Sequence, residues 1–125
     1  MSAAVILADT AGRITAWNGD AERLFGHPAS AALGRTLDLI VPPDHREAHW
    51  TGFRRAMATA QCRLDRAATN LPVLHADGDV RVLPARFTFL TDGRDVPVGA
   101  LVVYADPVGG EEAWGPVLAG PEDAA

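Results

Sequence analysis

The 125 residues are 48% hydrophobic and 22% charged, a balance typical of one compact domain and unlike a disordered or fibrous chain. The formal net charge of −5 argues against nucleic-acid binding, which normally needs a basic stripe, and it disfavours an anionic membrane surface. The longest apolar runs, such as 98–104, are too short to span a bilayer, and the N-terminus lacks a secretory signal. We therefore expect a cytoplasmic domain with no nucleic-acid or membrane partner.

Two features of the composition limit the chemistry further. Cys62 is the single cysteine, so the chain has no internal disulfide, no CxxC metal knuckle and no CxxCH haem attachment. All eleven basic residues are arginine, which excludes Schiff-base catalysis through lysine and a P-loop phosphate site.

The N-terminal part is predicted to begin with a β-hairpin. Residues 4–8 and 13–17 are strand-like runs separated by the turn residues 9–12. Two short helices are predicted next, over 21–25 and around 30–33, because each is followed by a glycine that can end a helix.

A longer helix is predicted from about Asp44, since Pro42 and Pro43 end the preceding apolar run and Asp44 with Glu47 can form a capping box. At 100° per residue, one stripe of this helix carries His49, Phe53, Ala56 and Ala60, with Trp50 and Met57 beside it. His49 is therefore predicted to face the core, where a buried imidazole needs a partner.

The C-terminal part reads as three strands. Segment 61–75 contains Pro72, which favours an irregular or edge strand. Segment 80–90 alternates, with Leu83, Ala85, Phe87 and Phe89 on one side. Segment 96–104 is almost continuously apolar, as expected for a central strand. The domain is predicted to span residues 1–106, with 107–125 as a flexible or loosely docked tail.

This order of elements resembles the PAS family. The likeness is carried by Gly12-Arg13-Ile14 with Trp17-Asn18, by Ala21-x-x-Leu24-Phe25-Gly26, by Gly34-Arg35 leading to Leu39-Ile40-Val41-Pro42, and by the closing segment 99–106. The resemblance implies an α+β fold in which short helices cover one face of a five-stranded antiparallel sheet. PAS domains are sensors and interaction modules, so the fold alone does not name a ligand.

Within this family, Pro42-Pro43-Asp44-x-Arg46-x-Ala48-His49 looks like a helix of the direct oxygen-sensing haem PAS proteins. The resemblance implies that His49 is the proximal iron ligand of a non-covalent haem b. Such a sensor would bind a diatomic gas (oxygen, carbon monoxide or nitric oxide) and signal to a partner protein or through a homodimer. The other expected haem contacts are an apolar wall and a basic rim residue: Phe53, Met57, Leu71, Phe87, Phe89, Leu101, Val103 and Arg66.

Two other functions stay open, a ligand-free PAS module that dimerises through its N-terminal segment and sheet, and a small haem enzyme. His49 itself could also be a partly exposed residue with local hydrogen bonds. A zinc site using His45 and His49 is disfavoured because Arg46 stands where the HExxH pattern needs glutamate. Cys62 follows the long helix, whereas the reactive cysteine of flavin-binding LOV photosensors precedes it. His27 and His75 are predicted to be plain surface residues.

Overall fold

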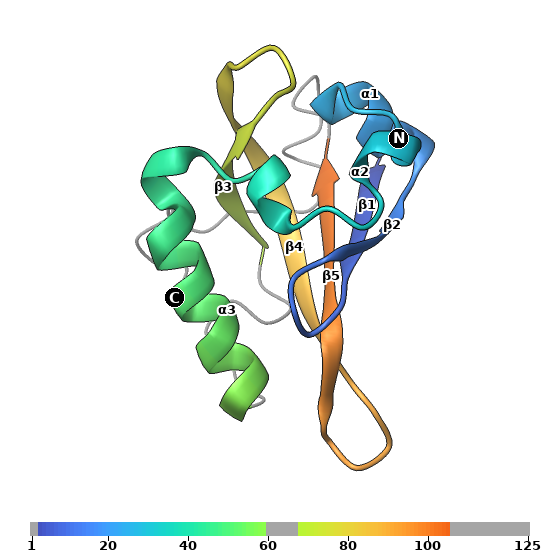
Figure 1. The fold of residues 1–125 in the computed structure, drawn as a ribbon, viewed down its shortest axis with the longest axis vertical. Helices are drawn as coiled ribbons and strands as arrows, with labels where there is room; N and C mark the ends of the chain where they lie inside the picture. The colour runs from blue at the N-terminus through green and yellow to red at the C-terminus, as the bar shows by residue number, and fades with distance from the viewer. Residues whose placement is uncertain (1–2, 60–67, 106–125) are drawn as a thin grey trace.

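The computed structural model describes residues 3–59 and 68–105. Its five strands form one antiparallel sheet in the order β2-β1-β5-β4-β3, and the helices lie on one side of it (Figure 1). The strands are β1 (Ala3–Ala8), β2 (Ile14–Trp17), β3 (Ala68–Leu74), β4 (Val80–Thr91) and β5 (Pro97–Ala105). The helices are α1 (Gly19–Phe25), α2 (Ala29–Ala32) and α3 (Arg46–Thr59), with 3-10 turns η1 (Leu37–Leu39) and η2 (Pro43–His45). The predicted α+β fold is confirmed.

The strand predictions are confirmed for the described residues, and the part of the predicted segment 61–75 that comprises residues 61–67 lies outside them. β1 and β2 form the expected hairpin, with Ile6 opposite Trp17. β5 lies in the middle of the sheet between β1 and β4, as its apolar sequence indicates. β3 is an edge strand, so the missing N–H of Pro72 is tolerated there.

Strand register divides the sheet into an inner face toward the helices and an outer face away from them. On the inner face, Ala4, Tyr104 and Ala85 lie side by side across β1, β5 and β4, and so do Ile6, Val102 and Phe87. The buried core includes Ala4, Ile6, Ala85 and Tyr104, and Val102 and Phe87 pack against it. The outer face pairs Val5 with Val103, and Leu7 with Leu101.

The long helix begins slightly later than its sequence predicts. Asp44 lies inside the 3-10 turn η2, and α3 begins at Arg46, so the expected cap at Asp44 is wrong. Pro42 accepts a hydrogen bond from the His45 amide at 2.9 Å, which makes a tight turn of the residues before the helix. The Arg46 side chain then donates to the Val41 and Asp38 carbonyls at 3.1 and 3.2 Å, fastening the start of α3 to η1.

Asn18 joins three segments near the start of the chain. Its Oδ1 accepts from the amides of Val5 (3.0 Å) and Ala21 (2.9 Å), and its Nδ2 donates to the Ala3 carbonyl at 3.0 Å. The side chain thus caps α1 and ties that helix to β1.

Asn18→Ala is expected to lower the free energy of unfolding by about 2 kcal/mol, because it removes a cap and leaves partly buried backbone groups unpaired. Asn18→Asp, which keeps the acceptor oxygens and loses only the donor, should cost less. Urea unfolding of the wild type and the two variants measures the order of their stabilities. An Asn18→Ala variant as stable as the wild type would contradict the role of Asn18 in capping α1 and joining it to β1.

Candidate functional site

His49 lies on the first turn of α3 in aromatic surroundings. Its ring centroid is 4.8 Å from that of Trp50, edge to face, and 6.0 Å from that of Phe53, roughly stacked. Nδ1 is buried and has no hydrogen-bond partner among the residues that the structure describes. A buried polar atom left unpaired costs about 1–3 kcal/mol, so this nitrogen has an unmet requirement for a partner.

The surroundings of His49 also favour the neutral ring. Burial lowers the pKa of His49 below its ordinary value, and the nearby Asp38 carboxylate offsets this only partly. A neutral imidazole keeps a lone pair, which is the form that binds metals. His49, a half-buried residue, therefore presents an unprotonated ring nitrogen beside the rings of Trp50 and Phe53.

This lowered pKa predicts a pH dependence of stability. The unfolded chain takes up a proton on His49 at a higher pH than the folded chain does. The free energy of unfolding should therefore decrease as the pH falls through about 6.5. The contribution should have a slope of at most about 1.4 kcal/mol per pH unit. Urea unfolding between about pH 7.5 and 5 gives the free energy of unfolding at each pH. This free energy should depend less on pH in His49→Leu than in the wild type or in His45→Leu. Identical profiles in all three would rule out the prediction.

Trp50 is held in place from two sides. Its Nε1 donates to Asp38 Oδ1 at 2.6 Å, and its ring lies directly over Gly12 in the β1–β2 turn. Asp38 also faces Arg46, with 3.8 Å between Oδ1 and Nε. Trp50 therefore has a structural role, and its ring contacts that of the neighbouring His49.

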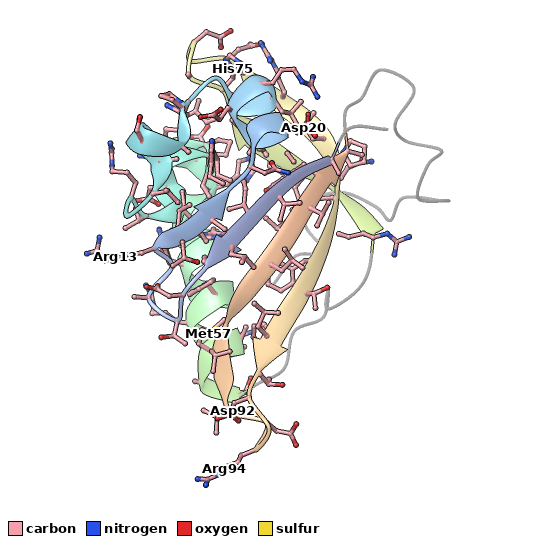
Figure 2. All side chains as sticks on the ribbon, turned by 90° about the vertical axis from the view of Figure 1, so that its right-hand side faces the viewer. Arg13, Asp20, Met57, His75, Asp92 and Arg94 are labelled. Atoms are coloured by element: carbon pink, nitrogen blue, oxygen red, sulfur yellow. The ribbon has the colours of Figure 1, made fainter. Side chains whose placement is uncertain are left out.

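Several of the predicted contact residues belong to the hydrophobic core of the domain or pack against it. Phe53 is buried within it, and Met57, Leu71 and Phe87 pack against it. Met57 projects from α3, as Figure 2 shows. Phe89 is buried next to Phe87, with 6.0 Å between the ring centroids.

Three predicted contact residues do not join this group. Leu101 and Val103 lie on the outer face of the sheet, opposite Leu7 and Val5. Their alternate neighbours on β5, such as Val102, take the inner positions, so an apolar wall that includes both Leu101 and Val103 is wrong. Arg66 lies outside the described residues.

The structure also has a concave region that was not predicted from the sequence. An open groove of about 500 Å³ lies between the loops around α2 and η1 and the β3–β4 turn, and we call it the polar groove. Its lining includes His27 and His75, which the sequence analysis predicts to be plain surface residues. No sequence signal could have found this groove, because residues 27–46 and 74–78 meet only in the folded chain.

Within residues 3–59 and 68–105, no three His, Cys, Asp or Glu side chains are grouped so that they could hold a metal ion. In the same part of the chain, no helix has the length and apolar character needed to cross a membrane.

Comparison with known proteins agrees with the fold, a five-stranded antiparallel sheet with helices on one side. A family model described as PAS fold matches residues 1–108. The chain therefore belongs to the PAS family, whose members are sensor and signalling domains.

The chain is also similar to a bacterial protein of much greater length. An uncharacterised protein of Azorhizobium caulinodans is 38% identical over 86 residues, which are 68% of this chain and 11% of that protein. The chain thus spans only about a tenth of that relative's length.

Solved structures show the same fold. The PAS domain of a Colwellia psychrerythraea protein has a TM-score of 0.70 at 22% identity, covering 83% of this chain and 85% of that one. The PAS domain of the histidine kinase ThkA has a TM-score of 0.57 at 26% identity, covering 85% and 100%. The PAS domain of the quorum-sensing receptor RpfR of Cronobacter turicensis, in complex with BDSF, has a TM-score of 0.67 at 14% identity, covering 86% and 96%.

Proposed function

We propose that this PAS domain senses a diatomic gas through a haem b group held by His49. The observation that carries the proposal is the buried Nδ1 of His49, which lacks a hydrogen-bond partner among the described residues. Because burial lowers the pKa of this imidazole, the ring is neutral and its lone pair is available to a metal. An iron atom close to this ring would satisfy the unmet requirement.

A single histidine ligand suits haem better than a structural metal ion. A structural zinc site takes four protein ligands, and no such group exists among the described residues. Haem supplies four ring nitrogens of its own, so one histidine is sufficient. Phe53, Met57, Leu71 and Phe87 would contact the porphyrin and exclude water. When bound, the iron would supply a coordination position for oxygen, carbon monoxide or nitric oxide.

Haemin titration of the purified 125-residue protein tests the proposal. The wild type and His45→Ala should bind one haem per chain and give an intense Soret band. His49→Ala should bind at least about tenfold more weakly, because it loses the iron ligand. His45 lies one turn before His49 and is the matched control. Equal binding by His49→Ala, with an unchanged circular dichroism spectrum, would refute haem ligation by His49.

The outer face of the sheet favours a second candidate function, that of an interaction module without a ligand. Val5, Leu7, Leu101 and Val103 form an apolar patch there and are only partly buried. Patches of this kind often mark contact sites between proteins. Val103→Asp should lower the affinity of any homodimer or partner complex measured by sedimentation, without changing haemin binding.

A further inference from the structure

The polar groove carries an excess of basic side chains on a chain whose net charge is −5. The basic residues that line it are His27, Arg35, Arg46 and His75. Asp38 is the single carboxylate in this lining. These residues come from separate segments of the chain, so the fold itself concentrates them. An electropositive groove on an acidic domain attracts anions.

The charges within the groove are not balanced internally. Asp38 accepts a hydrogen bond from Trp50 and faces Arg46. The Arg46 guanidinium also donates to two backbone carbonyls. The Arg35 guanidinium has no ion pair or side-chain hydrogen bond with any residue of the described ranges. Arg35 is therefore free to donate to a ligand.

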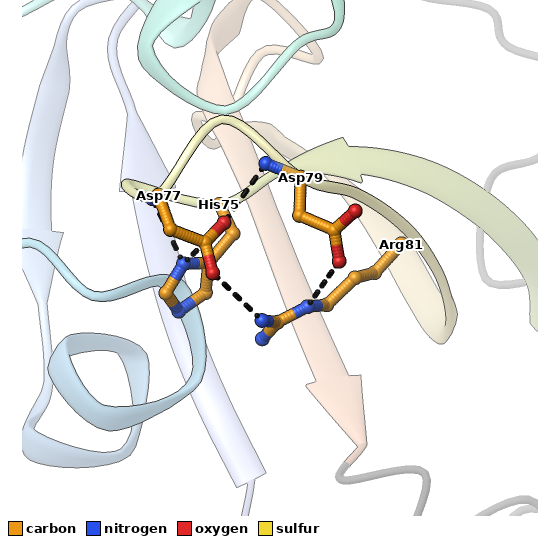
Figure 3. A network of polar contacts seen from close by, with 4 residues as sticks. All are labelled: His75, Asp77, Asp79 and Arg81. Carbon is orange, nitrogen blue, oxygen red and sulfur yellow. Dashed lines mark hydrogen bonds and ion pairs between the residues drawn. The ribbon is translucent and has the colours of Figure 1, made fainter.

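His75 is held in place at the other side of the groove. Its Nδ1 accepts from the Asp77 amide at 3.1 Å and lies 3.1 Å from Asp77 Oδ1, and Arg81 in turn contacts Asp77 and Asp79 (Figure 3). The His75 ring also packs closely against Gly26, where a Cβ atom would lie 2.7 Å from Cε1. Because Nδ1 is occupied by Asp77, Nε2 is the nitrogen left to meet a ligand.

We propose that the polar groove binds a small anion bearing a phosphate or carboxylate group, with Arg35 as its main contact and His27 and His75 as additional donors. A guanidinium matches both groups, because it can donate two parallel hydrogen bonds to their oxygens. The groove volume of about 500 Å³ is in the range of small-molecule sites. Neither the family assignment nor the proposed haem site accounts for this group of residues.

The electrostatics of His27 agree with this assignment. Burial is the main cause that lowers the pKa of His27, and the positive charges of His75 and Arg35 lower it further. An anion in the groove would favour the protonated ring and raise this pKa again. Binding therefore has a readout at His27 in addition to its readout at Arg35.

Two-dimensional amide NMR of the full chain tests the proposal, with sodium phosphate or sodium acetate added at about pH 6.5 and sodium chloride matched for ionic strength. Saturable shifts should appear in residues 35–36 and 74–78, and the histidine proton titration should show a higher pKa for His27. Saturation by phosphate alone would identify a phosphate ligand, and saturation by acetate alone a carboxylate ligand.

Two variants separate a site from general screening. Arg35→Gln should weaken binding about tenfold, and Arg94→Gln should leave it unchanged. Arg94 is an exposed arginine on the β4–β5 turn, at the end of the molecule opposite His75 (Figure 2). His75→Gln provides a second test if Arg35→Gln does not fold. Shifts that fail to saturate, that chloride reproduces, or that both arginine variants weaken equally would overturn the proposal.

Discussion

Replacing Phe25 by alanine is expected to lower the free energy of unfolding by about 4 kcal/mol. Phe25 is 0% exposed and connects α1 to the sheet. Its ring centroid lies 5.5 Å from that of Trp17 on β2 and 5.1 Å from that of Tyr104 on β5. The substitution would leave a cavity that these large neighbours cannot close.

Leu33→Ala is the control for this prediction. Leu33 is an apolar residue from the same region, but 47% of it is exposed, so its loss should change stability by less than about 1 kcal/mol. Urea unfolding measures both variants. A Phe25→Ala protein within about 1 kcal/mol of the wild type would show that the contact between α1 and the sheet contributes little to the fold.

Gly12→Ala is expected to be the second severe substitution, with a loss of about 3 kcal/mol. Two effects add at this position. Gly12 has φ = +81°, which a residue with a Cβ atom adopts only at a cost. A Cβ atom there would also overlap the Trp50 ring. Trp50 would have to move, and its hydrogen bond to Asp38 would weaken.

Gly34 separates these two effects. It has φ = +85°, almost the same as Gly12, but a Cβ atom there would have no neighbour within 4 Å. Gly34→Ala should therefore show only the backbone cost of about 1 kcal/mol. Thermal unfolding compares the two variants directly. If Gly12→Ala cost no more than Gly34→Ala, the ring of Trp50 would not be fixed over the hairpin.

Most of the fold could be predicted from the sequence because its signals are local. The alternation in β4, the apolar run of β5 and the glycines after the short helices each specify an element with little help from the rest of the chain. The beginning of α3 was less predictable. It depends on Arg46 reaching backbone carbonyls of η1, and this contact exists only after folding.

The surroundings of His49 were predicted in part. The helical period places His49 and Phe53 on one side of α3, and both lie in aromatic contact there. The sequence of β5 did not show on which face of the sheet Leu101 and Val103 would lie. Apolar residues occupy both faces of this strand, so its sequence has no alternation of apolar and polar residues. His49 also contacts Trp50, whose position is set by Gly12 and Asp38 far away in the sequence.

Resonance Raman spectroscopy of the full chain loaded with ferrous haem tests the proposed bond between His49 and iron most directly. We predict an iron–histidine stretching band that shifts to lower frequency when the histidines carry nitrogen-15. The band should be absent in His49→Gly, return when free imidazole is added, and persist in His45→Gly. A band that survives in His49→Gly without imidazole, or no iron–histidine band in the wild type, would contradict the proposed haem sensor.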